Sequence, residues 1–116
     1  GRFLCYPFAE FDNDEGLSYY GVDQYTRKWQ KIRTHGSKIV ENICQSSARD
    51  VLYDAMPRAE DAGFSIVLHV HDELVAEARK ELRVDDLSAI MAAGEPWTSG
   101  LPLAAAGFET FRYKKG

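Results

Sequence analysis

The sequence predicts an α+β fold, with a small antiparallel sheet and one long and one shorter helix packed on it. Three observations support this: a long stretch with helical periodicity, two short apolar strands around a polar turn, and the element order β-β-α-β-β-α-β. The 116 residues suit one modest domain, and no repeat or internal linker interrupts them. We therefore predict a single domain over residues 1–116.

Composition excludes several classes of protein. The chain is 45% apolar and 28% charged, which is typical of a globular domain rather than a disordered one. No apolar run approaches the roughly 20 residues that span a bilayer, so we expect no membrane partner. Cys5 and Cys44 form neither a metal-binding spacing nor a disulfide framework, which favours a reduced, cytoplasmic setting.

The charge distribution is uneven. The formal net charge is −4, which argues against binding of nucleic acid by the chain as a whole. Between Gln24 and Val40, however, the sequence holds five cations and no acid: Arg27, Lys28, Lys31, Arg33 and Lys38. One interpretation is a solvated basic helix, and the other is a local nucleic-acid contact.

The N-terminal region reads as a hairpin over residues 1–22. Residues 1–9 alternate like a strand, 12–16 have turn chemistry, and 17–22 form a returning strand rich in tyrosine. The acidic turn resembles a calcium loop only loosely, because Gly16 stands at the fifth position rather than the sixth. A solvated hairpin tip is the favoured interpretation.

Helical character begins at Arg27, and Thr34 could cap a long helix from about His35 to Met56. Pro57 is expected to kink or end this helix, and Gly63 to form a left-handed cap. Eight small or apolar residues share one broad side: Ile39, Val40, Ile43, Ser47, Ala48, Val51, Leu52 and Ala55. Four polar residues form a narrow stripe opposite: Lys38, Asn42, Gln45 and Arg49.

Residues 64–70 and 74–78 are strands by composition. A second helix begins near Asp85 and runs from Leu87 to about Ala93, and a final strand is expected from Leu103 to Tyr113.

His71-Asp72-Glu73 connects the two apolar strands. Two-residue hairpin turns usually contain glycine, so an Asp72-Glu73 turn should be costly, and local rules often fail at functional sites. A carboxylate held at such a turn is exposed and suits a hard cation such as Mg²⁺. Two alternatives remain open: ordinary polar turn filling, and a zinc site in which His69 and His71 share one strand face.

These residues resemble motif C of the family A DNA polymerases. The upstream runs Tyr20–Trp29 and Val40–Gln45 resemble the phage-type branch of that family, as do the closing runs 100–103 and 107–109. The resemblance covers nearly the whole chain and implies the C-terminal part of a polymerase palm.

The resemblance also implies roles. Asp72 would be a metal-binding catalytic carboxylate, His71 would lie near the primer 3′ end and Glu73 would be a supporting acid. Gln45 would contact the minor groove of the new duplex. The family usually places an amide four residues before this glutamine, where this chain has Glu41. The polar stripe favours Asn42 as the second minor-groove contact, and Lys38 and Arg49 as phosphate contacts.

The implied chemistry is nucleotidyl transfer with two Mg²⁺ ions, and the partners would be primer-template DNA and a deoxynucleoside triphosphate. The family's first catalytic aspartate and its nucleotide-gripping fingers helix have no match here, so we expect the chain alone to be inactive. Two alternatives belong to other classes. One is a free-standing mobile-element or prophage remnant acting as a non-enzymatic interaction module or homo-oligomer. The other is a metal-dependent hydrolase using His69, His71 and Asp72.

Overall fold

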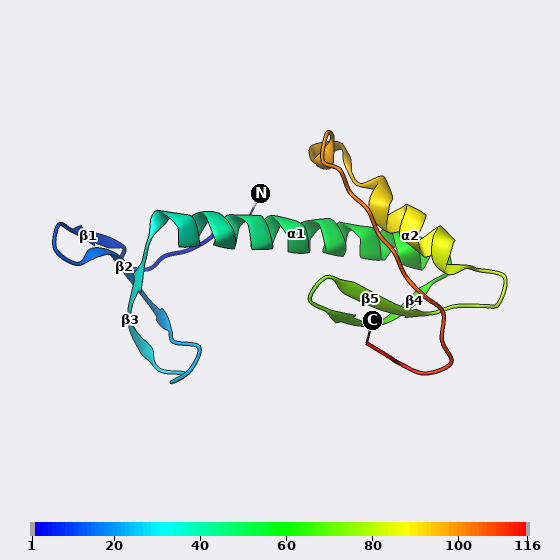
Figure 1. Cartoon of the computed structure of the whole chain (residues 1–116), viewed down its shortest axis with the longest axis horizontal. Helices are drawn as coiled ribbons and strands as arrows, with labels where there is room; N and C mark the ends of the chain where they lie inside the picture. The colour runs from blue at the N-terminus through cyan, green and yellow to red at the C-terminus, as the bar shows by residue number, and fades with distance from the viewer. Residues whose placement is uncertain (1, 116) are drawn as a thin grey trace. The chain divides into compact units, whose positions relative to one another are not determined.

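A computed structural model describes residues 2–115 of the chain. It contains five strands, two α-helices and one 3₁₀ turn among these residues (Figure 1). The fold divides into two compact units, Gly1–Ser46 and Ser47–Gly116. The strands are antiparallel throughout, so the predicted α+β class is confirmed, although the strands form two separate sheets rather than one.

The first unit holds a three-stranded sheet in the order β1 (Glu10–Asp12), β2 (Gly16–Val22) and β3 (Trp29–Thr34). The hairpin around the acidic turn is therefore confirmed. The predicted strand over residues 1–9 is wrong, because residues 2–9 adopt no regular structure. Pro7 has no N–H to donate and Phe8 takes a positive φ of 51°, which interrupts an extended ladder.

The expectation of helical structure from Arg27 is wrong, and with it the interpretation of a solvated basic helix. Arg27 and Lys28 lie in the loop before β3, and Lys31 and Arg33 lie on β3 itself. Pairing of β3 with β2 brings these two cations beside acids of the neighbouring hairpin. The Lys31 Nζ lies 3.5 Å from a Glu10 carboxylate oxygen, and the Arg33 guanidinium lies 2.9 Å from Glu15.

Helix α1 runs from Gly36 to Asp61. His35, rather than Thr34, precedes its first turn: the Lys38 N–H donates to the His35 carbonyl at 3.0 Å and to its ring Nδ1 at 3.3 Å. Pro57 was expected to kink or end the helix, and it does not end it, because α1 continues to Asp61. Ala55 and Ala59, on either side of it, are buried to 1% and 0% exposure, and this packing holds the turn despite the missing hydrogen bond. Gly63 follows with φ +99°, as the left-handed cap prediction requires.

The second unit holds a two-stranded antiparallel sheet, β4 (Ser65–Val70) and β5 (Glu73–Glu77), as predicted. The ladder slips by one residue between Ile66 and Leu68, so Val67 is an extra residue in β4 and is 54% exposed. Helix α2 (Val84–Ala93) and the 3₁₀ turn η1 (Pro96–Thr98) follow.

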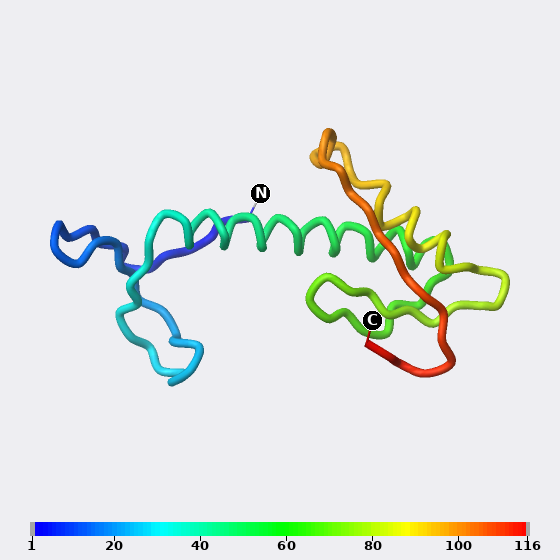
Figure 2. The backbone as a smooth tube through the Cα atoms, in the orientation of Figure 1, coloured from blue at the N-terminus to red at the C-terminus, as the bar shows by residue number. Residues whose placement is uncertain are grey.

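The predicted final strand from Leu103 to Tyr113 is wrong. Figure 2 shows the chain after η1 as an irregular trace, and residues 99–115 contain no helix or strand. Glu109 fastens this segment to the start of α2, where its carboxylate accepts from the Val84 N–H at 3.0 Å and lies 3.2 Å from the Arg83 Nε. Side-chain contacts of this kind hold the segment in place of the backbone ladder that a strand would make.

The apolar core is small. Among the described residues it consists of Leu52, Ala55, Ala59 and Phe64, all in the second unit. Val40 and Ile43, on the predicted apolar side of α1, are 58% and 49% exposed. Of that predicted face only Leu52 and Ala55 are buried. Within residues 2–115 no helix is long and apolar enough to cross a membrane.

Candidate functional site

A two-residue turn connects β4 to β5. Val70 pairs with Glu73, so the loop consists of His71 and Asp72, one residue earlier than the Asp72-Glu73 turn that the sequence suggested. His71 has a φ of +54°, a left-handed conformation that hairpin turns normally assign to glycine or asparagine. The turn therefore places a residue with a left-handed backbone directly beside an exposed carboxylate, and residues in such sparsely populated conformations cluster at functional sites.

Asp72 is exposed, and its carboxylate makes no hydrogen bond or ion pair with any other residue in the range 2–115. It borders a pocket of about 150 Å³ whose other walls are apolar or small side chains from α1, α2 and residues 103–105. Glu73, the first residue of β5, is half-buried. Asp72 thus presents a negative oxygen pair that the rest of its own unit leaves uncompensated.

The donor set at the turn fits part of a hard-cation site. No group of three or more His, Cys, Asp or Glu within residues 2–115 is arranged to hold a metal ion. His69, His71 and Asp72 therefore do not form the zinc centre that a hydrolase would need. His69 instead packs edge-on against Tyr53, with ring centroids 5.3 Å apart. A single free carboxylate can supply one of the oxygen ligands of an ion such as Mg²⁺, with the other ligands coming from elsewhere.

The first unit contains three of the four residues of the polar stripe. Glu41 engages two of them: it lies 3.0 Å from the Lys38 Nζ and accepts a 3.2 Å hydrogen bond from the Gln45 amide. Asn42 is half-buried and donates to the Tyr6 hydroxyl at 3.2 Å. Gln45 is exposed, so its amide can exchange Glu41 for another acceptor, whereas the Asn42 amide already has a partly buried partner.

The fourth stripe residue, Arg49, lies in the second unit. Its guanidinium carbon is 5.8 Å from the centroid of the Tyr53 ring, a cation–π contact. No carboxylate among the described residues pairs with it. Arg49 is exposed and positively charged, as a phosphate contact would require.

Sequence reasoning missed the part that Glu41 and Tyr53 play. The spacing gave a usable signal in both cases, because Glu41 stands three residues after Lys38 and four before Gln45, and Tyr53 stands four after Arg49. These are the separations at which side chains meet on a helix surface.

Comparison with known proteins identifies one informative relative. No family model matches the chain, and no solved structure matches it. A protein named DNA polymerase, from Bacillus phage SP02, is 43% identical over 121 aligned residues that include 99% of this chain. The chain is similar to a segment of a phage DNA polymerase.

The chain spans 18% of the length of that relative. The likeness supports the predicted resemblance to a DNA polymerase segment, and it does not favour the alternative of a non-enzymatic interaction module. The aligned region includes 99% of the chain and therefore covers both units.

Proposed function

We propose that the chain forms the part of a family A DNA polymerase palm that presents motif C and a DNA-contacting helix. The observation that carries the proposal is the 43% identity to the Bacillus phage SP02 DNA polymerase along nearly the whole chain. The exposed, unpaired carboxylate of Asp72 at a strained turn supports it independently.

In this proposal Asp72 supplies one carboxylate ligand to the catalytic Mg²⁺. The metal, when bound, supplies charge stabilisation for nucleotidyl transfer to the primer 3′-hydroxyl. His71 precedes the ligand directly, and its left-handed backbone fixes the direction in which the turn points. Glu73, half-buried at the start of β5, adds negative charge beside the ligand and anchors the turn in the ladder.

The N-terminal half of α1 contributes DNA contacts of its own. Gln45 is proposed to donate to the minor-groove acceptors that all base pairs share, and Lys38 to contact phosphate. Both are held by Glu41 in the free chain, so DNA binding exchanges that carboxylate for acceptors on the DNA. Arg49, in the second unit, is proposed as a separate phosphate contact.

The 116 residues alone are not expected to extend a primer. Within residues 2–115 no three side chains of the metal-binding types are grouped to hold an ion, and two-metal transfer needs more than one protein carboxylate at the ions. The first catalytic aspartate and the nucleotide-gripping residues would come from other parts of a polymerase.

The direct test is a chimaera in which these residues replace the matching segment of the Bacillus phage SP02 DNA polymerase. We expect the chimaera to incorporate nucleotides on primer-template DNA, and Asp72→Asn to lower its rate by at least about a hundredfold. Asp85→Asn, an exposed acid in the first turn of α2, is the matched control and should leave the rate unchanged. Incorporation by the Asp72→Asn chimaera at a rate close to that of the control would exclude the assigned role.

A further inference from the structure

The loop between β2 and β3, residues 23–28, is a built structure rather than a loose connection. The Asp23 N–H donates to the Lys28 carbonyl and the Arg27 N–H donates to the Asp23 carbonyl, both at 2.9 Å. The Asp23 carboxylate accepts from the Tyr25 N–H at 2.9 Å and from the Thr26 N–H at 2.7 Å. Four hydrogen bonds to one residue therefore fix the backbone of the tip.

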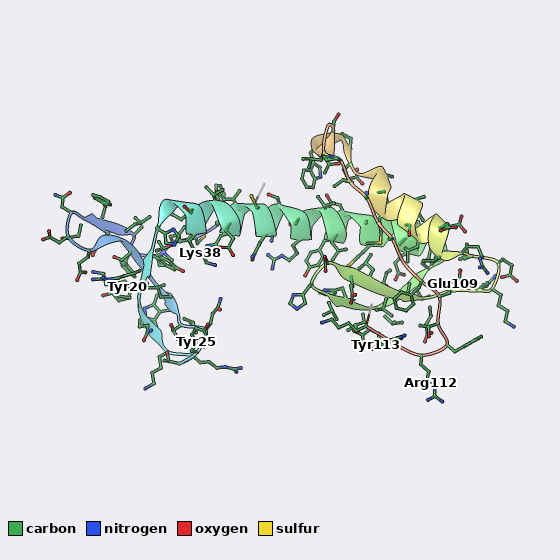
Figure 3. All side chains as sticks on the ribbon, in the orientation of Figure 1. Tyr20, Tyr25, Lys38, Glu109, Arg112 and Tyr113 are labelled. Carbon is green, nitrogen blue, oxygen red and sulfur yellow. The ribbon has the colours of Figure 1, made fainter. Side chains whose placement is uncertain are left out.

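This rigid tip displays an aromatic ring to solvent. Tyr25 is 94% exposed, and Figure 3 shows it at the loop end of the β2–β3 hairpin. Arg27 and Lys28 beside it are also exposed. Trp29, at the first position of β3, adds a second aromatic side chain that is 57% exposed. The loop and the start of β3 therefore present two aromatic side chains to solvent close together in the sequence.

The two loop cations differ from the other basic residues of their region. Lys31, Arg33 and Lys38 each have a carboxylate within 4 Å. Arg27 and Lys28 have no such partner among residues 2–115. The nearest acid in sequence, Asp23, is occupied by backbone N–H groups, and these bonds hold the pKa of its carboxyl below the usual value. The tip is thus locally positive although the whole chain has a net charge of −4.

We propose that this loop binds an unpaired nucleic-acid strand, with a base stacked on Tyr25 and with Arg27 and Lys28 on the adjoining phosphates. An exposed aromatic beside cations is the arrangement by which proteins bind single strands without reading their sequence. An unpaired strand is favoured over duplex because a base can stack on a protruding ring only when it is free of its own stack. The proposal does not depend on the role of Asp72.

The test measures binding of a fluorescent oligothymidylate to the full chain by anisotropy at low salt. Tyr25→Ala is expected to weaken binding by about tenfold, and Tyr25→Phe to retain it, because one stacked base contributes on this scale. Phe11→Ala is the matched control, since Phe11 is an exposed aromatic on the other hairpin. An abasic strand of the same length should bind Tyr25→Ala and the parent chain equally.

The phosphate contacts are tested through salt dependence. Loss of two phosphate contacts by Arg27→Ala with Lys28→Ala should reduce the slope of log affinity against log salt by about 1.4. Arg79→Ala with Lys80→Ala removes the same charge from another exposed pair and should leave the slope unchanged. Equal effects of the loop and control substitutions would overturn the proposal, as would preference for duplex over unpaired DNA.

A second measurement guards against loss of folding in the isolated chain. A photo-crosslinking phenylalanine analogue at position 25 of the chimaeric polymerase should crosslink to an unpaired template extension, whereas the same analogue at position 11 should not. Absence of crosslinks from position 25 in a chimaera that still incorporates nucleotides would refute the loop contact and leave the proposed function standing. If Asp72→Asn left incorporation unchanged while position 25 still crosslinked, the proposed function would be refuted and the loop contact would stand.

Discussion

Replacing His71 by glycine should stabilise the fold while damaging the site. An L-residue in the left-handed region costs about 1–2 kcal/mol, and His71 occupies that region with φ +54°. Glycine removes this cost but loses about 0.5–1 kcal/mol through the greater freedom of the unfolded chain. The difference predicts a net gain of up to about 1.5 kcal/mol in the free energy of unfolding for His71→Gly.

Urea unfolding of the full chain, followed by circular dichroism, measures this gain. His69→Gly is the matched control, because His69 is extended, lies within β4 and packs edge-on against Tyr53. Weakening the strand and losing the ring contact should lower the free energy of unfolding by about 1–2 kcal/mol. If His71→Gly destabilised the chain as much as His69→Gly does, the turn would not be strained. In the chimaeric polymerase His71→Gly should slow incorporation, because glycine would no longer hold the turn, and with it Asp72, in one direction.

Three other substitutions test separate parts of the structure. Glu41→Gln should free Lys38 and raise affinity for duplex DNA by about twofold to fivefold, measured by anisotropy. The carboxylate then no longer competes with DNA phosphate for Lys38, and the gain is small because an exposed ion pair is weak. Backbone hydrogen bonds from Thr26 and Tyr25 hold the carboxyl pKa of Asp23 below the usual 3.8 in the folded chain. The ionised carboxylate therefore stabilises the fold fully above pH 3.8, and this stabilisation is lost as the pH falls through the folded-state pKa. Amide NMR signals of the loop should shift below pH 4 in the parent and stay constant in Asp23→Asn. Arg58→Met breaks the half-buried pair with Glu95 and should lower the free energy of unfolding by about 1–2 kcal/mol, with Glu95→Gln completing a double-mutant cycle.

The sequence predicted the second unit's framework well because its signals are local. Two apolar runs around a polar turn gave β4 and β5, and Gly63 was correctly placed in a left-handed conformation. The strand β3 was missed because five cations in the region suggested a solvated helix. Ile32 and Thr34 are half-buried at alternating positions, which was the available strand signal.

Other errors came from treating apolar composition as sufficient for a strand. Residues 2–9 and 103–113 are both mostly apolar, yet neither forms a strand, because a strand requires a partner ladder as well as suitable residues. For the site, the sequence placed Asp72 at the turn but could not show that Glu41 holds Lys38 and Gln45. The three- and four-residue spacings allow these contacts, but which partner an exposed side chain takes depends on its rotamer, and the residue pattern does not determine the rotamer.

The slip in the β4 ladder gives this strand one residue more than its pairing requires, and the surplus falls at Val67. Loss of Val67 would leave Ile66 opposite Ala76 and Leu68 opposite Val75 in an uninterrupted ladder, with the turn unmoved. A change in length between Leu68 and Glu73 would instead displace Asp72. We therefore expect natural insertions and deletions in related chains to occur at the bulge and to be absent from the six residues that follow it.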